Sequence, residues 1–336
     1  MPEPSLKAQA WALFDEIVAT ADLRDANPWR IDGADRTFVP DFDTLSRLLG
    51  VPIFLGATSQ SGVPALALDV WTAYELRRAG FDPDRVWPRA SPPRVLPYDV
   101  SALVDSLPKG LREQVRQRLD RGQSGGTASA TANLLGKNYV KQVDVVMSSW
   151  QTGPELMIST KRMDSSFGKN AANRVEESYG DAKNLSLRYP QASLGFLYGL
   201  RSTAFDLEPD TALWLIDLLA KLGREDDAYD AVGLVVPEWS GGDTSASDDA
   251  ADSDPRETAP TDIEPAVLAD VDVREVEPAP VPVAELPTVQ LRHDLVPREL
   301  SPARFFAVLV DRVLANSPIN FHVGARELRG RSVGGG

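Results

Sequence analysis

Cysteine is missing from this chain of 336 residues, and histidine occurs only twice. A chain without cysteine has no disulfides, no zinc–cysteine or iron–sulfur sites and no thiol nucleophile. The two histidines, His293 and His322, have no pattern of metal-ligating residues around them, which disfavours a zinc site or a histidine-based triad. These classes of chemistry are therefore set aside.

The sequence also lacks a long apolar run and a nucleotide-binding loop. No segment approaches the 18 apolar residues of a membrane span, and the N-terminus has neither the basic nor the apolar region of a signal peptide. Residues 56–62, GATSQSG, lack the Gly-Lys-Ser/Thr of a phosphate-binding loop, and no GxGxxG opens a helix. We therefore expect a cytoplasmic protein with no membrane partner.

Acidic residues are concentrated in one segment. The formal net charge is −14, and residues 238–290 hold 14 acidic and 2 basic residues, a net of −12. Residues 126–205 have instead 9 basic and 6 acidic residues. Because the excess acid is local, the overall charge is weak evidence against a nucleic-acid partner.

The first region, residues 1–108, is predicted to be mainly helical. Apolar spacing predicts helices over 5–20 and 67–79, the second ended by a glycine. Prolines and arginines then fill residues 81–99 and interrupt regular structure. We interpret this region as an accessory unit for recognition or dimerisation.

The second region, residues 109–237, opens with a basic amphipathic helix over 110–121 and then alternates strand and helix patterns. Strands are expected over 139–150, 155–162, 192–200 and 231–236, and helices over 170–188 and 211–222. This β-β-α-β-α-β order predicts an α/β fold in which helices flank a central mixed sheet.

The remaining chain divides into an acidic and an apolar part. Residues 238–290 have few large apolar groups and are expected to be largely disordered. Residues 291–330 are apolar again, with a helix expected over 302–316 and an edge strand over 319–323. This last part is too apolar to stand alone. We expect it to pack on the core, which makes the acidic segment an insertion.

Candidate catalytic residues gather on the two strands of a predicted hairpin. Asp144 stands between valines, an unusual position for a carboxylate without a partner or a function. Side chains alternate along the second strand, so Glu155, Ser159 and Lys161 share one face. Pairing across the turn at 151–154 brings Asp144 toward the Lys161 end of that strand.

This arrangement provides what phosphodiester hydrolysis needs. Mg²⁺ prefers oxygen ligands and keeps several waters, and it polarises a phosphate and activates a water. Asp144 would hold the ion, and the Lys161 ammonium would orient the water or offset charge on the phosphate. Glu155 is one further candidate ligand. Taken singly, the ordinary interpretations are favoured, namely Asp144 as a structural cap, Lys161 as a solvated charge and Glu155 as a surface charge beside the turn; only the joint arrangement favours the catalytic one.

An acid on one strand followed by Ser159-Thr160-Lys161 on the next resembles the PD-(D/E)XK nuclease superfamily, whose second strand carries an acid, any residue and a lysine. The Ser-x-Lys variant is similar to a subgroup of type II restriction endonucleases that cut sites with a CCGG core. In that subgroup a glutamate on the following helix supplies the missing carboxylate. Here the segment NRVEE follows, so the resemblance implies Glu176, with Glu177 as the alternate, as a metal ligand.

The resemblance covers about residues 138–205 and implies a restriction-endonuclease-like core that cleaves double-stranded DNA with Mg²⁺. The implied catalytic set is Asp144, Ser159, Lys161 and Glu176. Two positions depart from the subgroup: Val143 rather than proline precedes Asp144, and the arginine-rich base-reading segment after the lysine is not reproduced. A duplex has two strands to cut, so a homodimer with twofold symmetry is expected.

Basic and amide side chains would contact the DNA. Arginine and lysine neutralise phosphates, and some arginines read guanine in the major groove. The candidate residues are Arg89, Arg116, Arg162, Lys169, Asn170, Asn173 and Arg174. For any single arginine, solvation of the surface or pairing with the acidic segment is the alternative.

Two other functions remain open. A catalytically inert DNA-binding subunit of a defence or repair complex would keep the fold, and the serine at position 159 in place of an acid favours it. A protein-interaction module would use the acidic segment 238–290 and would have no DNA affinity at physiological salt.

Overall fold

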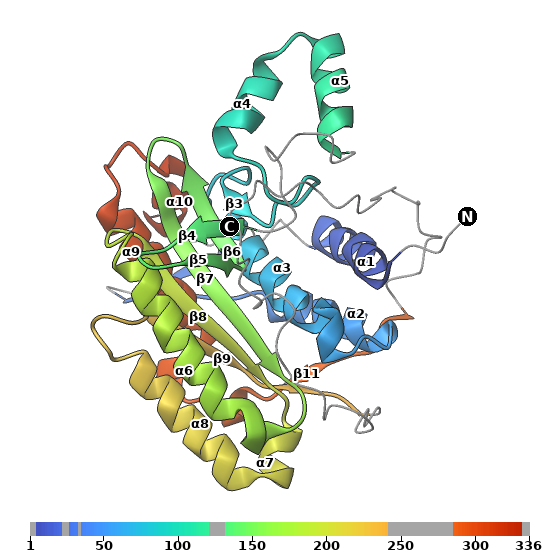
Figure 1. Cartoon of the computed structure of the whole chain (residues 1–336), viewed down its shortest axis with the longest axis vertical. Coiled ribbons are helices and arrows are strands. Elements are labelled where there is room, and N and C mark those ends of the chain that lie inside the picture. Colours follow the sequence, from blue (N-terminus) through green and yellow to red (C-terminus); the bar gives the residue numbers. More distant parts are fainter. Residues whose placement is uncertain (1–4, 22–26, 33–34, 121–131, 241–284, 331–336) are drawn as a thin grey trace.

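A five-stranded mixed sheet forms the centre of the protein, in the order β3-β6-β7-β8-β9 (Figure 1). The computed structural model describes residues 5–21, 27–32, 35–120, 132–240 and 285–330. The five strands are β3 (Val86–Trp87), β6 (Val145–Ser149), β7 (Gly153–Met163), β8 (Ser193–Leu200) and β9 (Ala231–Val235). β3, β6 and β7 are antiparallel neighbours, whereas β7, β8 and β9 are parallel. The expected α/β fold with a mixed central sheet is confirmed.

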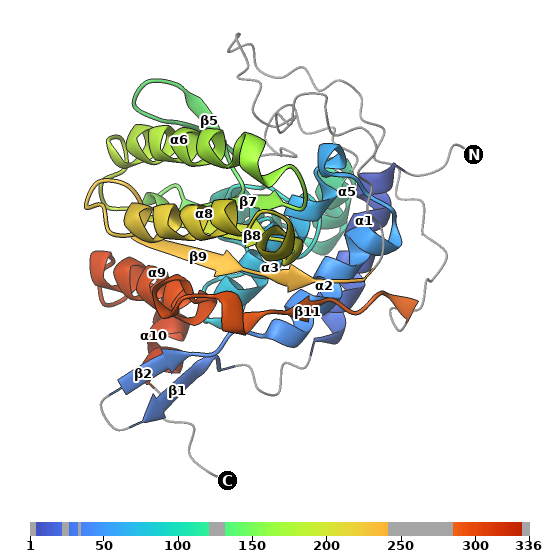
Figure 2. The ribbon, with the colours of Figure 1, turned by 90° about the horizontal axis from the view of Figure 1, so that it is seen from below.

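Helices cover both faces of the sheet (Figure 2). They are α6 (Phe167–Ser186) and α8 (Pro209–Leu222) on one face, and α3 (Val63–Arg78) and α9 (Pro302–Asn316) on the other. Successive side chains of a strand point to opposite faces, so Met157 of β7 belongs to the core under α6 and α8, and Ile158 to the core under α3 and α9. None of the helices in the described ranges is long and apolar enough to cross a membrane.

Glycines in two parallel strands let α9 approach the sheet closely. A Cβ at Gly195 would lie 2.7 Å from Cδ1 of Leu309, and one at Gly233 would lie 3.0 Å from the ring of Phe305. Larger residues at these two positions would push the helix away from the sheet.

The N-terminal region shares this core. Its remaining elements are α1 (Leu6–Thr20), β1 (Trp29–Asp32), β2 (Asp35–Phe38), α2 (Phe42–Phe54), α4 (Tyr98–Ser106) and α5 (Lys109–Asp120). The ring of Trp71 in α3 lies edge-on to Phe306 of α9 at 5.2 Å, and Phe14 of α1 is buried in the same core. Helices α4 and α5 project from the body and pack on one another through Val104 and Leu119 (Figure 1). Most of residues 1–108 therefore belongs to the same folded body as the sheet.

The first strand of the expected pair is divided. The pattern predicts one strand over 139–150, whereas the structure has β5 (Val140–Val143), a bend at Asp144, and then β6. β5 pairs with β4 (Ala132–Leu135) in a separate hairpin that lies along α6. The bend occurs because β6 joins the central sheet while β5 leaves it.

The C-terminal region returns to the core as expected, with Phe305, Leu309 and Val310 buried beneath the sheet. The remaining elements are α7 (Thr203–Leu207), β10 (Pro237–Glu238), β11 (Gln290–Leu291) and α10 (Val323–Gly330). β10 pairs with β11 and joins the two ends of the acidic segment. Most of that segment, residues 241–284, lies outside the described residues. The expectation that it is largely disordered therefore concerns residues that the structure does not describe.

The edge strand expected over 319–323 is wrong. The Phe321 amide donates to the Pro318 carbonyl in a turn, and His322 has a left-handed φ of 52°, which an extended strand does not allow. Helix α10 begins at the next residue.

Candidate active site

Asp144 lies where β5 ends and β6 begins. Its side chain is half-buried, and Oδ2 accepts a hydrogen bond from the Thr160 amide at 2.8 Å. The register pairs Val145 of β6 with Ile158 of β7, so Asp144 stands beside the Ser159–Thr160 segment. The carboxylate therefore acts as an acceptor for β7 at the point where β6 begins.

Ser159 and Lys161 lie on the sheet face that α6 covers. They alternate along β7 with Met157 and Met163, which both belong to the core on that side. Ser159 is buried and makes a hydrogen bond with the Tyr229 side chain, whereas Lys161 is half-buried. The serine and the lysine thus share a face, as the alternation predicts.

Asp181 is an acidic residue of α6 whose side chain is buried. Its carboxylate lies 2.5 Å from Nζ of Lys141 on β5 and accepts a hydrogen bond from the Tyr139 hydroxyl at 3.0 Å. Burial, together with the charge and hydrogen bond of Asp181, raises the pKa of Tyr139 to about 12. Asp181 therefore fastens the β4–β5 hairpin to the helix.

Tyr229 connects these groups. It is 3% exposed, and its hydroxyl donates to the Ser178 carbonyl of α6 at 2.9 Å. Burial raises its pKa most, and the charges of Asp181 and Asp144 raise it further, so both carboxylates lie near this phenol. We call Asp144, Ser159, Lys161, Asp181 and Tyr229 the β7–α6 cluster.

Glu176 and Glu177 are both exposed on α6. The helix turns Ala171, Val175 and Ala182 toward the core, and both glutamates lie off that stripe. Glu177 precedes Asp181 by about one turn, on the flank of α6 that meets the β4–β5 hairpin. Glu176 lies on another flank. By placement on the helix, Glu177 is therefore the closer of the two to the β7–α6 cluster.

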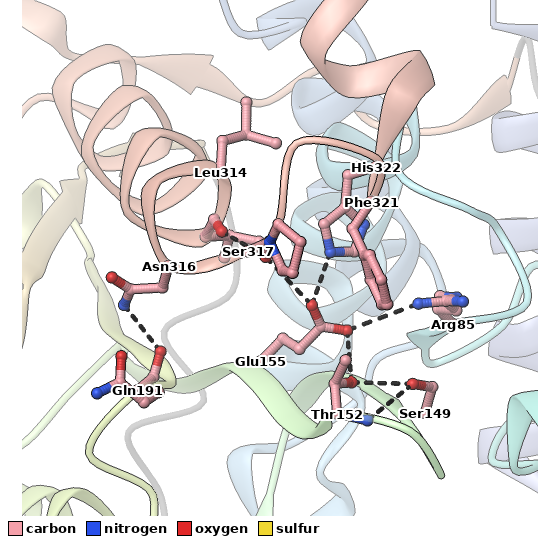
Figure 3. Close-up of polar contacts among 12 residues, drawn as sticks. Arg85, Ser149, Thr152, Glu155, Gln191, Leu314, Asn316, Ser317, Phe321 and His322 are labelled. Atoms are coloured by element: carbon pink, nitrogen blue, oxygen red, sulfur yellow. Dashed lines mark hydrogen bonds and ion pairs between the residues drawn. The ribbon is translucent and has the colours of Figure 1, made fainter.

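Glu155 lies at the other end of β7 from Lys161 and takes part in a different network (Figure 3). The two positions are six residue steps apart along the strand, on the order of 20 Å. Oε2 of Glu155 bonds Nε2 of His322 at 2.6 Å, and Oε1 accepts from the Thr152 hydroxyl at 2.8 Å. Its burial contradicts the solvated surface charge expected for this glutamate, and its distance from Lys161 places it outside the β7–α6 cluster.

The expected DNA-contacting residues are divided between surface and interior. Arg89 is ion-paired with Asp84 at 2.6 Å, and Arg162 with Asp164 at 2.9 Å, and both guanidinium groups are largely buried. Arg116 is more than half exposed on α5.

Around the start of α6, Asn173 is exposed and Arg174 is half-buried. The side chains of Lys169 and Asn170 lie outside the described residues. Of the expected DNA-contacting residues whose side chains the structure describes, the outward ones therefore lie on α5 and near the start of α6.

Several arginines of the proline-rich stretch stabilise the fold. Arg77 is half-buried and donates to the Pro88 carbonyl, and desolvation together with the nearby charge of Arg94 lowers its pKa to about 10. Arg94 pairs with Asp15 at 2.6 Å and lies 3.9 Å over the Trp11 ring. Arg77 therefore ties α3 to the stretch and Arg94 ties the stretch to α1, so these two cations serve the fold rather than a basic surface.

The described residues offer few side chains that could bind a divalent cation together. Among the described residues, no three His, Cys, Asp or Glu side chains converge on a common point. Mg²⁺ is commonly held by only one or two carboxylates, with water and phosphate oxygens completing the shell. Asp144 with one acid of α6 fits this requirement.

Helix phase in the sequence could have identified Asp181, because it adjoins Ala182 within the apolar spacing of α6. Tyr229 gave no such signal, because it precedes β9, which is far from β7 and α6 in the sequence. No family model, curated protein or solved structure matches the chain.

Proposed function

We propose that the chain is a Mg²⁺-dependent endonuclease for double-stranded DNA, with a PD-(D/E)XK type of core and a restriction role in host defence. One observation carries the proposal: Asp144, Ser159 and Lys161 gather at one end of the β6–β7 pair, on the face covered by α6. The mixed α/β sheet supports it at the level of the fold.

In this proposal Asp144 supplies one carboxylate ligand. A cation held there would supply polarisation of the scissile phosphate and a water of lowered pKa. Lys161 orients the attacking water or offsets negative charge on the phosphate. Ser159 holds the Tyr229 hydroxyl and so fixes the wall of the site. We assign the second carboxylate to Glu177, because Asp181 is already paired with Lys141.

The partner in this proposal is duplex DNA, bound by a homodimer. Arg116, Asn173 and Arg174 are the outward or partly outward candidates for phosphate contacts. Such contacts make binding strongly dependent on salt, since each releases counterions.

A plasmid cleavage assay tests the proposal. Wild type is compared with Asp144→Asn and Lys161→Met, in Mg²⁺ and in EDTA. Asp217→Asn and Lys221→Met are matched controls, because these residues form an exposed ion pair on α8. Cleavage should require Mg²⁺, disappear in the first pair and persist in the second. Metal-dependent cleavage that survives both site substitutions refutes the assignment.

The second candidate is a catalytically inert DNA-binding subunit that keeps this fold. The pairing of Asp181 with Lys141 and Tyr139 favours it, because this buried acid of the cluster is already engaged in holding the β4–β5 hairpin to α6. Such a protein would bind a duplex equally with and without Mg²⁺. A DNA-binding titration in both conditions separates the two candidates.

A further inference from the structure

A cavity of about 410 Å³ lies at the far end of the β6–β7 hairpin from the β7–α6 cluster. Its walls come from three separate segments: Asp82 and Arg85 in the turn after α3, Gln151 in the hairpin turn, and residues 320–324, which lead into the start of α10. Small-molecule sites typically have volumes of about 300–1,000 Å³ and a few convergent polar groups. This cavity has both properties.

The three walls meet at Glu155 (Figure 3). This buried carboxylate bonds His322 at 2.6 Å on one wall, accepts from Thr152 at 2.8 Å next to the hairpin turn, and lies 3.7 Å from Arg85 on the third. Burial alone would raise the pKa of Glu155, but the hydrogen bonds from His322 and Thr152 and the charges of His322 and Arg85 hold it below its usual value.

A buried charge is costly unless its partners satisfy it. The partners of Glu155 come from every wall, so the network fixes the shape of the cavity. Polar networks of this kind preorganise binding sites.

Two side chains of opposite charge face the same cavity. The Arg85 guanidinium lies 4.4 Å over the ring of Tyr98 and is only 16% exposed, so its position is fixed. The Asp82 carboxylate accepts a hydrogen bond from the Asp84 amide at 2.9 Å, which orients it as well. The two are three residues apart on one turn.

We propose that the cavity binds a small zwitterion of the α-amino acid class. Its carboxylate pairs with Arg85 and its ammonium with Asp82, while the amides of Gln151 and Asn320 hydrogen-bond the rest of the molecule. Asp82 and Glu155 would repel a ligand with only negative charge, and Arg85 would repel one with only positive charge. The proposal does not depend on the nuclease activity.

Saturation-transfer NMR on the full chain, with each common L-amino acid as the probe, tests this. At least one should bind saturably, and the corresponding 2-hydroxy acid, which lacks the ammonium, should bind at least about tenfold more weakly. Asp82→Asn and Arg85→Gln should each weaken binding by a similar factor. Asp206→Asn and Arg118→Gln, both exposed elsewhere, should leave it unchanged.

Three results would overturn the proposal. One is the failure of every amino acid to bind wild type. Another is equal binding of the amino acid and its hydroxy acid. The third is tighter binding in Asp82→Asn, which would identify an anion site. Thermal unfolding of each variant checks that the fold is kept, and Asp82→Asn tests the ammonium contact without touching the Glu155 network.

Discussion

The Thr160 amide donates to Oδ2 of Asp144 at 2.8 Å, across the point where β5 turns into β6. One carboxylate thus satisfies a main-chain donor of β7 and is also the proposed metal ligand. Structural and catalytic roles of the same side chain can be separated, because an amide keeps a hydrogen-bond acceptor but binds Mg²⁺ poorly.

Asp144→Asn should therefore retain stability and lose cleavage, whereas Asp144→Ala should lose both. A buried amide without its acceptor costs about 1–3 kcal/mol of unfolding free energy. Urea unfolding of the two variants and of wild type measures the difference. Equal stability of the Asn and Ala variants would mean that the hydrogen bond contributes nothing.

Two neighbouring glutamates on α6 provide a matched pair for the second metal ligand. Glu177→Gln should reduce Mg²⁺-dependent cleavage, because this residue lies on the flank that meets the β4–β5 hairpin. Glu176→Gln should leave cleavage unchanged. Both side chains are exposed, so the unfolding free energy of either variant should change by less than about 0.5 kcal/mol.

The cleavage rates of the two variants are compared at saturating Mg²⁺ and again at limiting Mg²⁺, where the loss of a metal ligand should reduce the rate most. A defect in Glu176→Gln with full activity in Glu177→Gln would restore the assignment that the family resemblance implies.

Four of the five strands of the sheet and the helices on its faces could be predicted from the sequence, because each has a strong local pattern, whereas β3 lies in the proline-rich stretch where no strand was expected. The helices expected over 211–222 and 302–316 agree with α8 and α9 to within a few residues, and the alternation of strands and helices along residues 139–236 is as expected except that the first strand is divided. These elements bury one continuous apolar face, which periodicity detects directly.

The features that local pattern missed depend on tertiary contacts. The bend at Asp144 exists because β5 pairs with β4 while β6 pairs with β7, and no residue in that stretch is a breaker. Similarly, residues 319–323 are kept from a strand by the bond between His322 and Glu155, far apart in sequence. The sequence pattern predicted that Asp144, Ser159 and Lys161 belong to one site, but it did not predict that Asp181 and Tyr229 lie beside them.

Glu75 on α3 should make the stability of the protein depend on pH. Burial raises its pKa to about 7, more than the charge of Arg78 lowers it. A carboxyl group with a raised pKa in the folded state contributes stability below the unfolded value, near 4.5, and this contribution is lost as pH rises through about 7.

Glu75→Gln should remove that dependence, so the variant should gain stability relative to wild type between about pH 5 and 7. The full effect is of the order of 3 kcal/mol. Urea unfolding across this range measures it, with Glu113→Gln on the exposed face of α5 as control. A wild-type curve that runs parallel to that of Glu75→Gln contradicts the prediction.

Gly80 allows the end of α3 to touch the start of α10 main chain to main chain. Its φ is +92°, and a Cβ there would lie 2.8 Å from the Ala325 nitrogen. Gly56 also has a positive φ, of +60°, but a Cβ there would have nothing within 4 Å. The pair therefore separates backbone strain from steric contact.

Gly56→Ala should cost only the strain, about 1–2 kcal/mol. Gly80→Ala should cost a further 1–3 kcal/mol or so, because main-chain atoms rather than a flexible side chain must move. Denaturant unfolding measures both. Since α10 forms one wall of the cavity, Gly80→Ala should also weaken amino-acid binding in the NMR experiment, while Gly56→Ala should not. Equal destabilisation by the two variants would show that α10 can move away from α3 without cost.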